Sequence, residues 1–248
     1  MDRANYQQFQ ESKVNRKKQK YIQWLRVLIQ LVFLGLLIAG LHKTVKSIFV
    51  IFLVASLVFG NYFCGWVCPF GTMQEYFSKI GSMVCKKKIK MPRRLQRYLQ
   101  FSRYILAIII VANIVAAFVD LSNINAYKTF THWMNGKFVQ PIAITIMGSF
   151  LILALFFERP FCNYFCSEGI RYGLASFTRF FTIKRYVHTC IQCKKCDKAC
   201  PMNIEISTNY HVRNAQCINC FKCIEVCPVV GTLSYGKVNP LEKSEENS

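Results

Sequence analysis

Four long apolar blocks constrain this chain more than any other feature. They cover residues 24–41, 47–63, 101–119 and 141–157, and each is 17 to 19 residues long. As α-helices they would measure roughly 25–29 Å, close to the bilayer hydrocarbon thickness of about 30 Å. We therefore expect an α-helical membrane protein with a four-helix transmembrane bundle. The alternative, a set of helices buried in a soluble core, is disfavoured because there are four such blocks.

The basic residues between these blocks predict their orientation. Lys and Arg number six in residues 1–23, eight in 64–100 and twelve after residue 157, against two each in 42–46 and 120–140. Because Lys and Arg mark the cytoplasmic side, we expect a multi-pass protein of the cytoplasmic (inner) membrane with both termini inside. Arg26 and Arg103, each the third residue of a block that starts on the cytoplasmic side, are expected to snorkel to the cytoplasmic interface. The membrane topology accounts for the net charge of +20, so no nucleic-acid partner is expected.

The C-terminal part contains two runs of the form Cys-x2-Cys-x2-Cys-x3-Cys-Pro. The first consists of Cys190, Cys193, Cys196 and Cys200, and the second of Cys217, Cys220, Cys223 and Cys227. In two-cluster bacterial ferredoxins the fourth cysteine of each run ligates the other cluster. The spacing therefore predicts two [4Fe–4S] clusters, held by Cys190, Cys193, Cys196 and Cys227 and by Cys217, Cys220, Cys223 and Cys200. Zinc sites usually show two CxxC pairs instead, and disulfides are disfavoured on the reducing cytoplasmic side.

Four further cysteines lie in an internal repeat. The segment Phe63-Cys64-Gly65-Trp66-Val67-Cys68 resembles Phe161-Cys162-Asn163-Tyr164-Phe165-Cys166, and each copy follows an even-numbered block. If the chain stays helical there, cysteines four residues apart share a face, and the two copies would bring four thiolates together at the cytoplasmic boundary. Cys64, Cys68, Cys162 and Cys166 are therefore candidate ligands of an additional iron–sulfur cluster or of zinc. The alternative is a set of buried or redox-active thiols without metal.

These features divide the chain into four parts. They are a basic cytoplasmic N-terminus (1–23), a four-span membrane domain with two CxxxC repeats (24–186), a small α+β two-cluster ferredoxin domain (187–236) and a disordered tail (237–248). Four cysteines per cluster leave no iron open to a substrate, so we expect electron transfer and assign no catalytic residue. The support for a quinone site is limited to two histidines on the outer side, His42 and His132, the second of which is followed by Trp133. A histidine beside an aromatic residue could hydrogen-bond a quinone carbonyl. Polar outer loops are the alternative.

The four blocks, the two CxxxC motifs and the tandem ferredoxin run together resemble the NapH-type membrane polyferredoxins. The same core is similar to the C-terminal half of NosR and to copper-oxidase assembly factors of the CcoG type. The resemblance covers about residues 20–236, and Ser167 departs from the proline that often follows the second cysteine. It implies an electron-transfer subunit of a quinone-linked oxidoreductase complex. Its partners would be the quinone pool and other redox subunits, such as a cytochrome, a flavin protein or an iron–sulfur protein.

Two other functions remain open at this point. The chain could be an assembly factor that uses its clusters to reduce a metal such as copper, but that type usually carries a further domain at its C-terminus. Here the sequence ends about twenty residues after Cys227, which favours the electron-transfer subunit. A passive anchor for a soluble oxidoreductase would not need the cysteines of the repeat.

Overall fold

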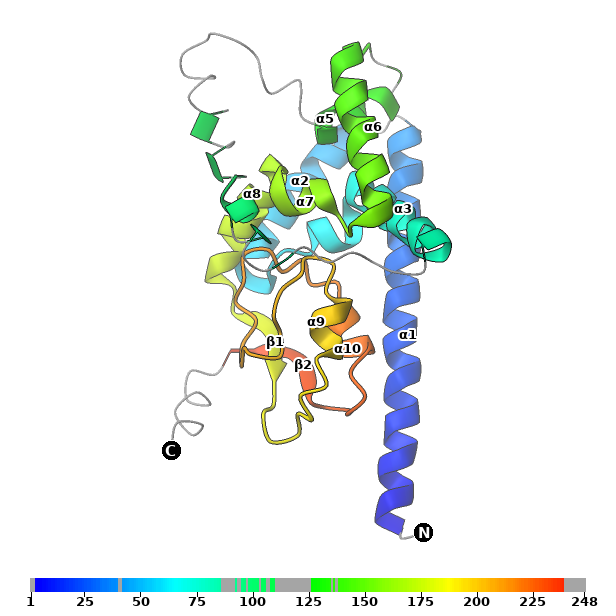
Figure 1. Cartoon of the computed structure of the whole chain (residues 1–248), viewed down its shortest axis with the longest axis vertical. Coiled ribbons are helices and arrows are strands. Elements are labelled where there is room, and N and C mark those ends of the chain that lie inside the picture. The colour runs from blue at the N-terminus through cyan, green and yellow to red at the C-terminus, as the bar shows by residue number, and fades with distance from the viewer. Residues whose placement is uncertain are drawn as a thin grey trace.

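The computed structural model describes residues 3–39, 42–85, 92, 95–96, 98–102, 104–105, 108–109, 126–134, 136 and 138–238. Most of the third predicted block, and the predicted tail from residue 239 onward, lie outside these residues. The described part is mostly helical with one small sheet (Figure 1). The four longest helices are α1 (Arg3–Ile38), α2 (His42–Phe59), α3 (Pro69–Cys85) and α6 (Pro141–Phe156). The shorter ones are η1 (Phe63–Val67, a π-helical turn), α5 (Ala126–Met134), α7 (Pro160–Tyr164), α8 (Ser167–Ala175), η3 (Ser176–Thr178), α9 (Lys195–Ala199) and α10 (Lys222–Glu225).

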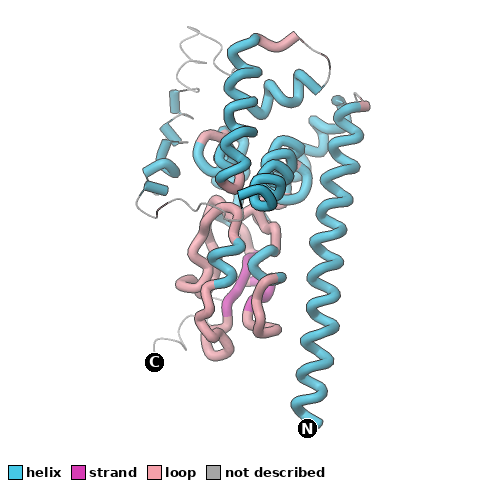
Figure 2. Tube along the Cα trace, turned by 45° about the vertical axis from the view of Figure 1, so that its right-hand side comes forward, coloured by secondary structure: helices cyan, strands magenta, loops and turns pink. Residues whose placement is uncertain are grey.

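The helices and the cysteine-rich loops occupy different ends of the molecule. Helices α2, α5 and α6 gather at one end, the loops around α9 and α10 form the other, and α1 runs beside both (Figures 1 and 2). Within α1, residues Gln19–Ile38 have a mean hydropathy of 1.9 and are long enough to cross a membrane, the one such helix among the described residues. Shorter apolar runs occur in α2 (Val50–Phe59) and α6 (Pro141–Phe156).

Large apolar side chains on α2 and α6 point outward. Ile51 and Ile142 are each 65% exposed, and Val54 and Ile152 are each 61% exposed. Large apolar side chains exposed along two helices are unfavourable in water and favourable in contact with lipid. The described helices therefore have the surface expected of membrane segments.

The cysteine-rich end is organised by a two-stranded antiparallel sheet. Strand β1 (Phe181–Arg185) pairs with β2 (Leu233–Lys237), so that Phe181 lies opposite Lys237. Apolar side chains from both strands and the intervening loops form one core together with the cysteines; they include Ile183, Met202, Ile204, Ile206, Val212, Ile218 and Leu233. The predicted ferredoxin-type α+β unit is present.

The C-terminus of α2 is held by the ferredoxin unit. Gly60 ends the helix with a φ of +86°, a conformation that favours glycine. The last carbonyls of a helix lack partners inside it. Here the Val58 carbonyl accepts from the Phe180 N–H at 3.0 Å, and the Phe59 carbonyl accepts from Asn219 Nδ2 at 2.9 Å. The ferredoxin unit is thus fastened directly to the end of a predicted span.

The condition under which each pair of CxxxC cysteines would share a helical face is not met, because neither even-numbered helix continues through its motif. Helix α2 ends at Phe59 before the separate π-helical turn η1, and α6 ends at Phe156 before α7 begins at Pro160. Proline lacks the N–H that would continue the helix and disfavours helical geometry in the residue before it. Arg159, which precedes it, has a φ of 51°. Cys64 and Cys162 therefore lie in the short helices η1 and α7, whereas Cys68 and Cys166 lie directly before α3 and α8.

Candidate iron–sulfur sites

The four cysteines of the repeat lie around one small cavity. Cys64, Cys68, Cys162 and Cys166 all line it, together with Ile218 of the ferredoxin unit. Although the helices are interrupted, the two copies of the motif thus face each other as predicted. We refer to these four residues as the repeat cysteines.

Aromatic contacts hold the two copies of the repeat together. Phe63 of the first copy stacks on Tyr172, which follows the second copy, with ring centroids 4.8 Å apart. Phe161 of the second copy packs edge-on against Phe70, which follows the first, at 5.2 Å. All four rings belong to one buried cluster. The phenylalanine that recurs before each first cysteine therefore locks one copy onto the segment after the other.

The second cysteine of each copy occupies the same local position, directly before a helix. The Cys68 sulfur accepts a hydrogen bond from the Gly71 N–H at 3.4 Å, and the Cys166 sulfur accepts one from the Gly169 N–H at 3.3 Å. N–H groups at the start of a helix favour a thiolate over a thiol. The repeat thus builds two equivalent sulfur positions, one in front of α3 and one in front of α8.

The groups of the protein that favour a thiolate do not outweigh the burial of these sulfurs. Burial raises the pKa of Cys64, Cys68 and Cys166, and repulsion from other repeat cysteines raises each of them further. Buried thiols of this kind become thiolates when a bound metal supplies the compensating positive charge. The donor set therefore fits a thiolate-ligated metal group.

The ferredoxin cysteines form two further groups, and each group combines cysteines from both runs. Cys190, Cys193, Cys196 and Cys227 line one cavity. Cys200, Cys217, Cys220 and Cys223 are all buried in the core of the ferredoxin unit. Burial first, and then the charge of Cys220, raises the pKa of Cys200 to about 12. Among the described residues, no three His, Cys, Asp or Glu side chains are grouped closely enough to hold a single metal ion.

The three groups of cysteines follow one another through the molecule. Cys196 and Cys227 of the first ferredoxin group pack against the core that contains the four cysteines of the second group. The loop that carries the second group then meets the repeat: Trp66 Nε1 donates to the Asn219 carbonyl at 2.9 Å, and Gly65 packs on Ile218. An unbroken series of contacts thus links the first ferredoxin group to the repeat cysteines.

Gly65 is required for this contact, and Gly65→Ala tests it. A β-carbon at this position would lie 2.1 Å from the Ile218 carbonyl oxygen, which belongs to the backbone and cannot rotate away. Overpacking of this kind costs about 1–3 kcal/mol, so we expect a lower midpoint of thermal unfolding. Gly148→Ala, on α6, is the control, since its β-carbon would meet nothing within 4 Å. Equal unfolding midpoints for the two variants would contradict the close contact.

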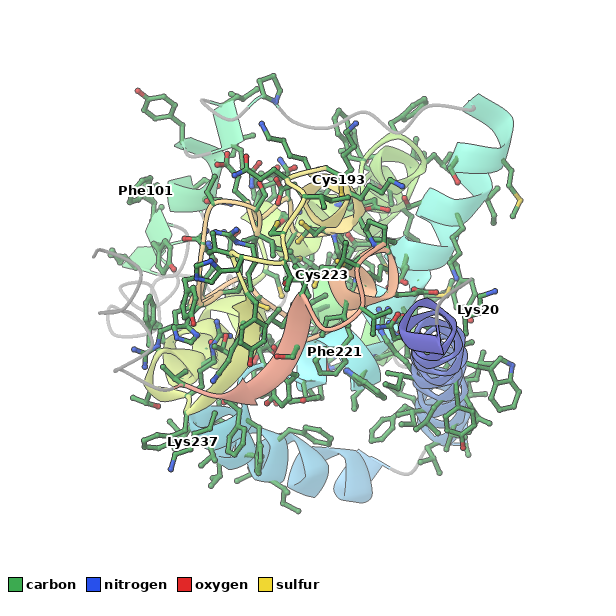
Figure 3. The ribbon with its side chains drawn as sticks, turned by 90° about the horizontal axis from the view of Figure 1, so that it is seen from below. Lys20, Phe101, Cys193, Phe221, Cys223 and Lys237 are labelled. Carbon is green, nitrogen blue, oxygen red and sulfur yellow. The ribbon has the colours of Figure 1, made fainter. Side chains whose placement is uncertain are left out.

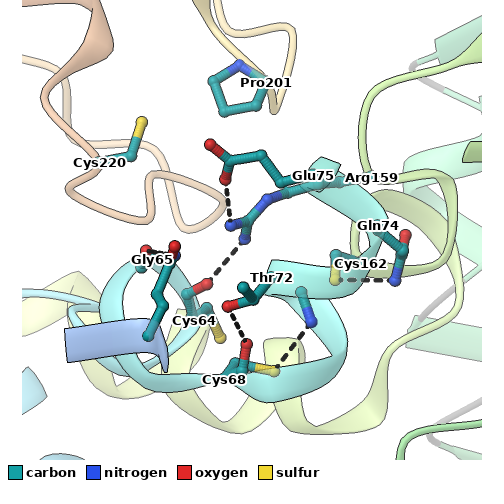
Figure 4. A network of polar contacts seen from close by, with 12 residues as sticks. Cys64, Gly65, Cys68, Thr72, Gln74, Glu75, Arg159, Cys162, Pro201 and Cys220 are labelled. Atoms are coloured by element: carbon teal, nitrogen blue, oxygen red, sulfur yellow. Dashed lines mark hydrogen bonds and ion pairs between the residues drawn. The ribbon is translucent and has the colours of Figure 1, made fainter. Parts of the chain in front are cut away.

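A buried ionic network lies beside these groups, and the sequence did not predict it (Figure 4). Glu75 on α3 forms ion pairs with Arg26 at 2.5 Å, Arg159 at 2.8 Å and Lys222 at 3.0 Å. Burial alone would raise the pKa of Glu75, but Arg159, Lys222 and Arg26 hold it well below its usual range. Arg159 also donates to the Cys64 carbonyl at 2.7 Å. The network thus joins the repeat, α1 and the second ferredoxin loop.

The predicted role of Arg26 is wrong. Arg26 is 2% exposed and does not extend to the interface, because its side chain donates to the Gly65 carbonyl and to Glu75. Glu75 is the only acidic residue in 64–100. Its isolation among basic residues is the one sequence feature that could have indicated a buried ion pair. Arg103, for which the same role was predicted, lies outside the described residues.

Arg179 is a second buried guanidinium beside the ferredoxin core. It is 1% exposed, and its Nη2 donates to the Val212 carbonyl. Burial raises the pKa of Cys217, whereas the positive charge of Arg179 opposes this increase. Within the described part of the chain, Arg179 Nε and Nη1 have no oxygen or nitrogen partner. A buried guanidinium next to a cysteine fits an anionic iron–sulfur group.

The residues considered for a quinone do not join these sites. His132 and Trp133 are exposed on α5, and only Tyr127 of that helix lines the cavity of the repeat cysteines. His42 begins α2, and its side chain lies outside the described part of the structure. The side chain of Cys85, which has no counterpart in the repeat, also lies outside it.

Comparison with known proteins agrees with this arrangement. A family described as "4Fe-4S binding domain" matches residues 42–92 and 139–181, the two halves of the repeat, and a "4Fe-4S dicluster domain" matches 182–228. YccM of Escherichia coli K12, named for electron transport, is 30% identical over 81% of this chain and 58% of its own length. NirI of Paracoccus denitrificans is 27% identical over 56% of this chain and 21% of its own. The regulatory protein NosR of Pseudomonas aeruginosa is 23% identical over 56% of this chain and 20% of its own length. No solved structure matches the chain.

The grouped cysteines and the two matching families define an iron–sulfur protein of the ferredoxin type, and one of its relatives, YccM, is named as an electron-transport protein. The chain belongs to the NosR/NapH-like family of 4Fe–4S electron-transport proteins. It spans about 58% of the length of YccM and a smaller share of NirI and NosR.

Proposed function

We propose that this protein is a membrane-anchored electron-transfer subunit containing three iron–sulfur clusters. The observation that carries this proposal is the series of three four-cysteine groups, in contact from the exposed end of the ferredoxin unit to the helices. Two [4Fe–4S] clusters would be held by the ferredoxin groups, and a third cluster by the repeat cysteines. Each cluster supplies a site for one electron at a time.

The remaining residues of the chain shape this path. Burial of Cys200, Cys217, Cys220 and Cys223 excludes water from the middle group. Arg159 interacts electrostatically with both Cys162 and Cys220, so one cation faces the middle group and the repeat cysteines together. Positive charge favours the reduced, more negative state of a cluster. Arg159 would therefore couple the potentials of the two neighbouring sites.

We further propose that the membrane domain has four spans and that the ferredoxin unit lies on the cytoplasmic side. The apolar run Gln19–Ile38 and the outward apolar faces of α2 and α6 support this topology, as does the distribution of Lys and Arg. The repeat cysteines would then lie at the cytoplasmic boundary of the bilayer, where electrons could pass to the quinone pool or to another redox subunit. This path makes a passive anchor the weaker explanation, because an anchor has no use for the repeat cysteines.

The number of clusters is the first experimental test. Three [4Fe–4S] clusters predict about twelve iron and twelve sulfide ions per chain, and a [2Fe–2S] cluster at the repeat predicts about ten. Protein purified without oxygen would be assayed for iron, acid-labile sulfide and zinc. A count of about eight would limit the clusters to the ferredoxin unit and overturn the proposal for the repeat cysteines.

A further inference from the structure

The most exposed of the cysteines whose side chains the structure describes lies at the end of the ferredoxin unit farthest from α5 and α6. Cys193 is the one exposed cysteine among the twelve that the structure describes; the others are partly or fully buried. It lies in the loop between β1 and α9, which projects from the end of the molecule opposite those helices (Figure 1). An electron exchanged with a soluble partner therefore has its shortest route to the clusters here.

The surface around Cys193 combines an apolar centre with positive charge. Ile191 is 64% exposed and lines the same cavity as Cys193, and exposed Pro228 lines it as well. Lys195 and Lys198 on α9 are both exposed. A small apolar patch with charged residues around it suits a weak, rapidly exchanging complex.

The single acidic residue of the segment 186–204 does not neutralise this surface. Asp197 is turned inward: its Oδ1 accepts from the Ile206 N–H at 2.6 Å and from the Ser207 N–H at 2.8 Å. Its carboxylate thus fixes the following loop, while the lysines on either side of it point outward. The resulting surface is complementary to a negatively charged partner.

We propose that Ile191, Lys195, Lys198 and Pro228 form the docking surface for a soluble, acidic, one-electron carrier protein. This inference rests on the proposed electron-transfer function. One electron would move between the carrier and the cluster of the Cys193 group, so that one is oxidised by one electron as the other is reduced. No bond forms or breaks, and no proton has to move.

The test is the binding of a strongly acidic [2Fe–2S] ferredoxin to the full chain in nanodiscs of neutral lipid. We expect Lys195→Glu/Lys198→Glu to raise its Kd by about tenfold or more at low salt, with a smaller difference at high salt. The control is Lys20→Glu/Lys237→Glu, which changes the net charge equally at two exposed positions away from Cys193 (Figure 3). The rate of electron exchange with the ferredoxin should fall in the same variant.

Three results would overturn the docking surface. The first is an unchanged Kd for the Lys195→Glu/Lys198→Glu variant, and the second is an equal loss of affinity in the control variant. The third is a loss of affinity seen only in nanodiscs with anionic lipid, which would assign the two lysines to lipid binding. Reduction by photoreduced deazariboflavin, a small uncharged reductant, separates this inference from the proposed function. If the unaltered chain shows no reducible iron–sulfur absorbance, the electron-transfer function fails; if reduction is normal and binding is insensitive to the lysines, only the docking surface fails.

Discussion

Replacement of both Cys64 and Cys162 by alanine is expected to lower the iron content from about twelve to about eight atoms per chain. The two residues contribute half of the sulfurs around the cavity of the repeat, one from each copy. Two remaining thiols cannot complete the four-cysteine ligation of an iron–sulfur cluster. Iron analysis and electron paramagnetic resonance of the reduced protein would measure the loss.

The ferredoxin unit provides an internal control for this variant. Its eight cysteines are unchanged, so its two [4Fe–4S] signals should persist and would show that the chain has folded. Cys85→Ala should retain about twelve irons, because Cys85 belongs to none of the three groups. Unchanged iron content and spectra in the double variant would show that the repeat cysteines hold no iron.

The same variant also tests the electron path. With the clusters of the ferredoxin unit intact, reduction from the exposed end should proceed at its normal rate. Transfer onward to a membrane-soluble acceptor should be lost, because the repeat cysteines lie between the ferredoxin unit and the helices. Undiminished transfer would mean that electrons pass to the membrane by another route.

The cysteine groups could be predicted from the sequence because their signal is local. The spacing of Cys190, Cys193 and Cys196 within one loop, and the recurrence of Cys64 and Cys68 as Cys162 and Cys166, are visible without knowledge of the fold. The prediction that the two copies of the CxxxC motif face each other followed from their equivalent positions after apolar blocks. The local geometry did not follow, because the break at Gly60 and the turn before Pro160 interrupt helices that hydropathy alone would continue.

The buried ionic network could not be predicted because its partners are distant in sequence. Glu75 is separated by 49 residues from Arg26 and by 84 from Arg159, and its third partner, Lys222, lies between two ferredoxin cysteines. Arg26 at the start of an apolar block has the same sequence pattern whether it extends to the interface or pairs inside the protein. Only the packing of α1 beside α3 and the ferredoxin unit decides between the two.

Glu75→Gln is expected to destabilise the protein by about 3–5 kcal/mol, the usual cost of removing one partner from a buried ion pair. The variant leaves Arg26 and Arg159, which are 2% and 1% exposed, together with Lys222 and without a counter-charge. Chemical unfolding in detergent would measure the change. Glu75→Asp, which keeps the charge, should recover part of the loss.

A pair with one exposed partner provides the comparison for this variant. Arg171 is 63% exposed and pairs with Glu168, which is 12% exposed, at 3.2 Å; because solvent reaches the Arg171 guanidinium, Arg171→Gln should cost less than Glu75→Gln, about 1 kcal/mol. The Glu75 network and the Arg171–Glu168 pair also differ in their effect on the reduction potentials of the clusters. Loss of the negative charge of Glu75 leaves Arg159 unneutralised beside Cys162 and Cys220, which should raise the potentials of the neighbouring clusters by roughly 60 mV, equivalent to about 1.4 kcal/mol for one electron. Arg171→Gln should change these potentials less, because solvent screens the charge of the exposed Arg171 side chain. A Glu75→Gln variant as stable as Arg171→Gln, with unaltered potentials, would mean that the network neither holds the ferredoxin unit in place nor acts on the clusters.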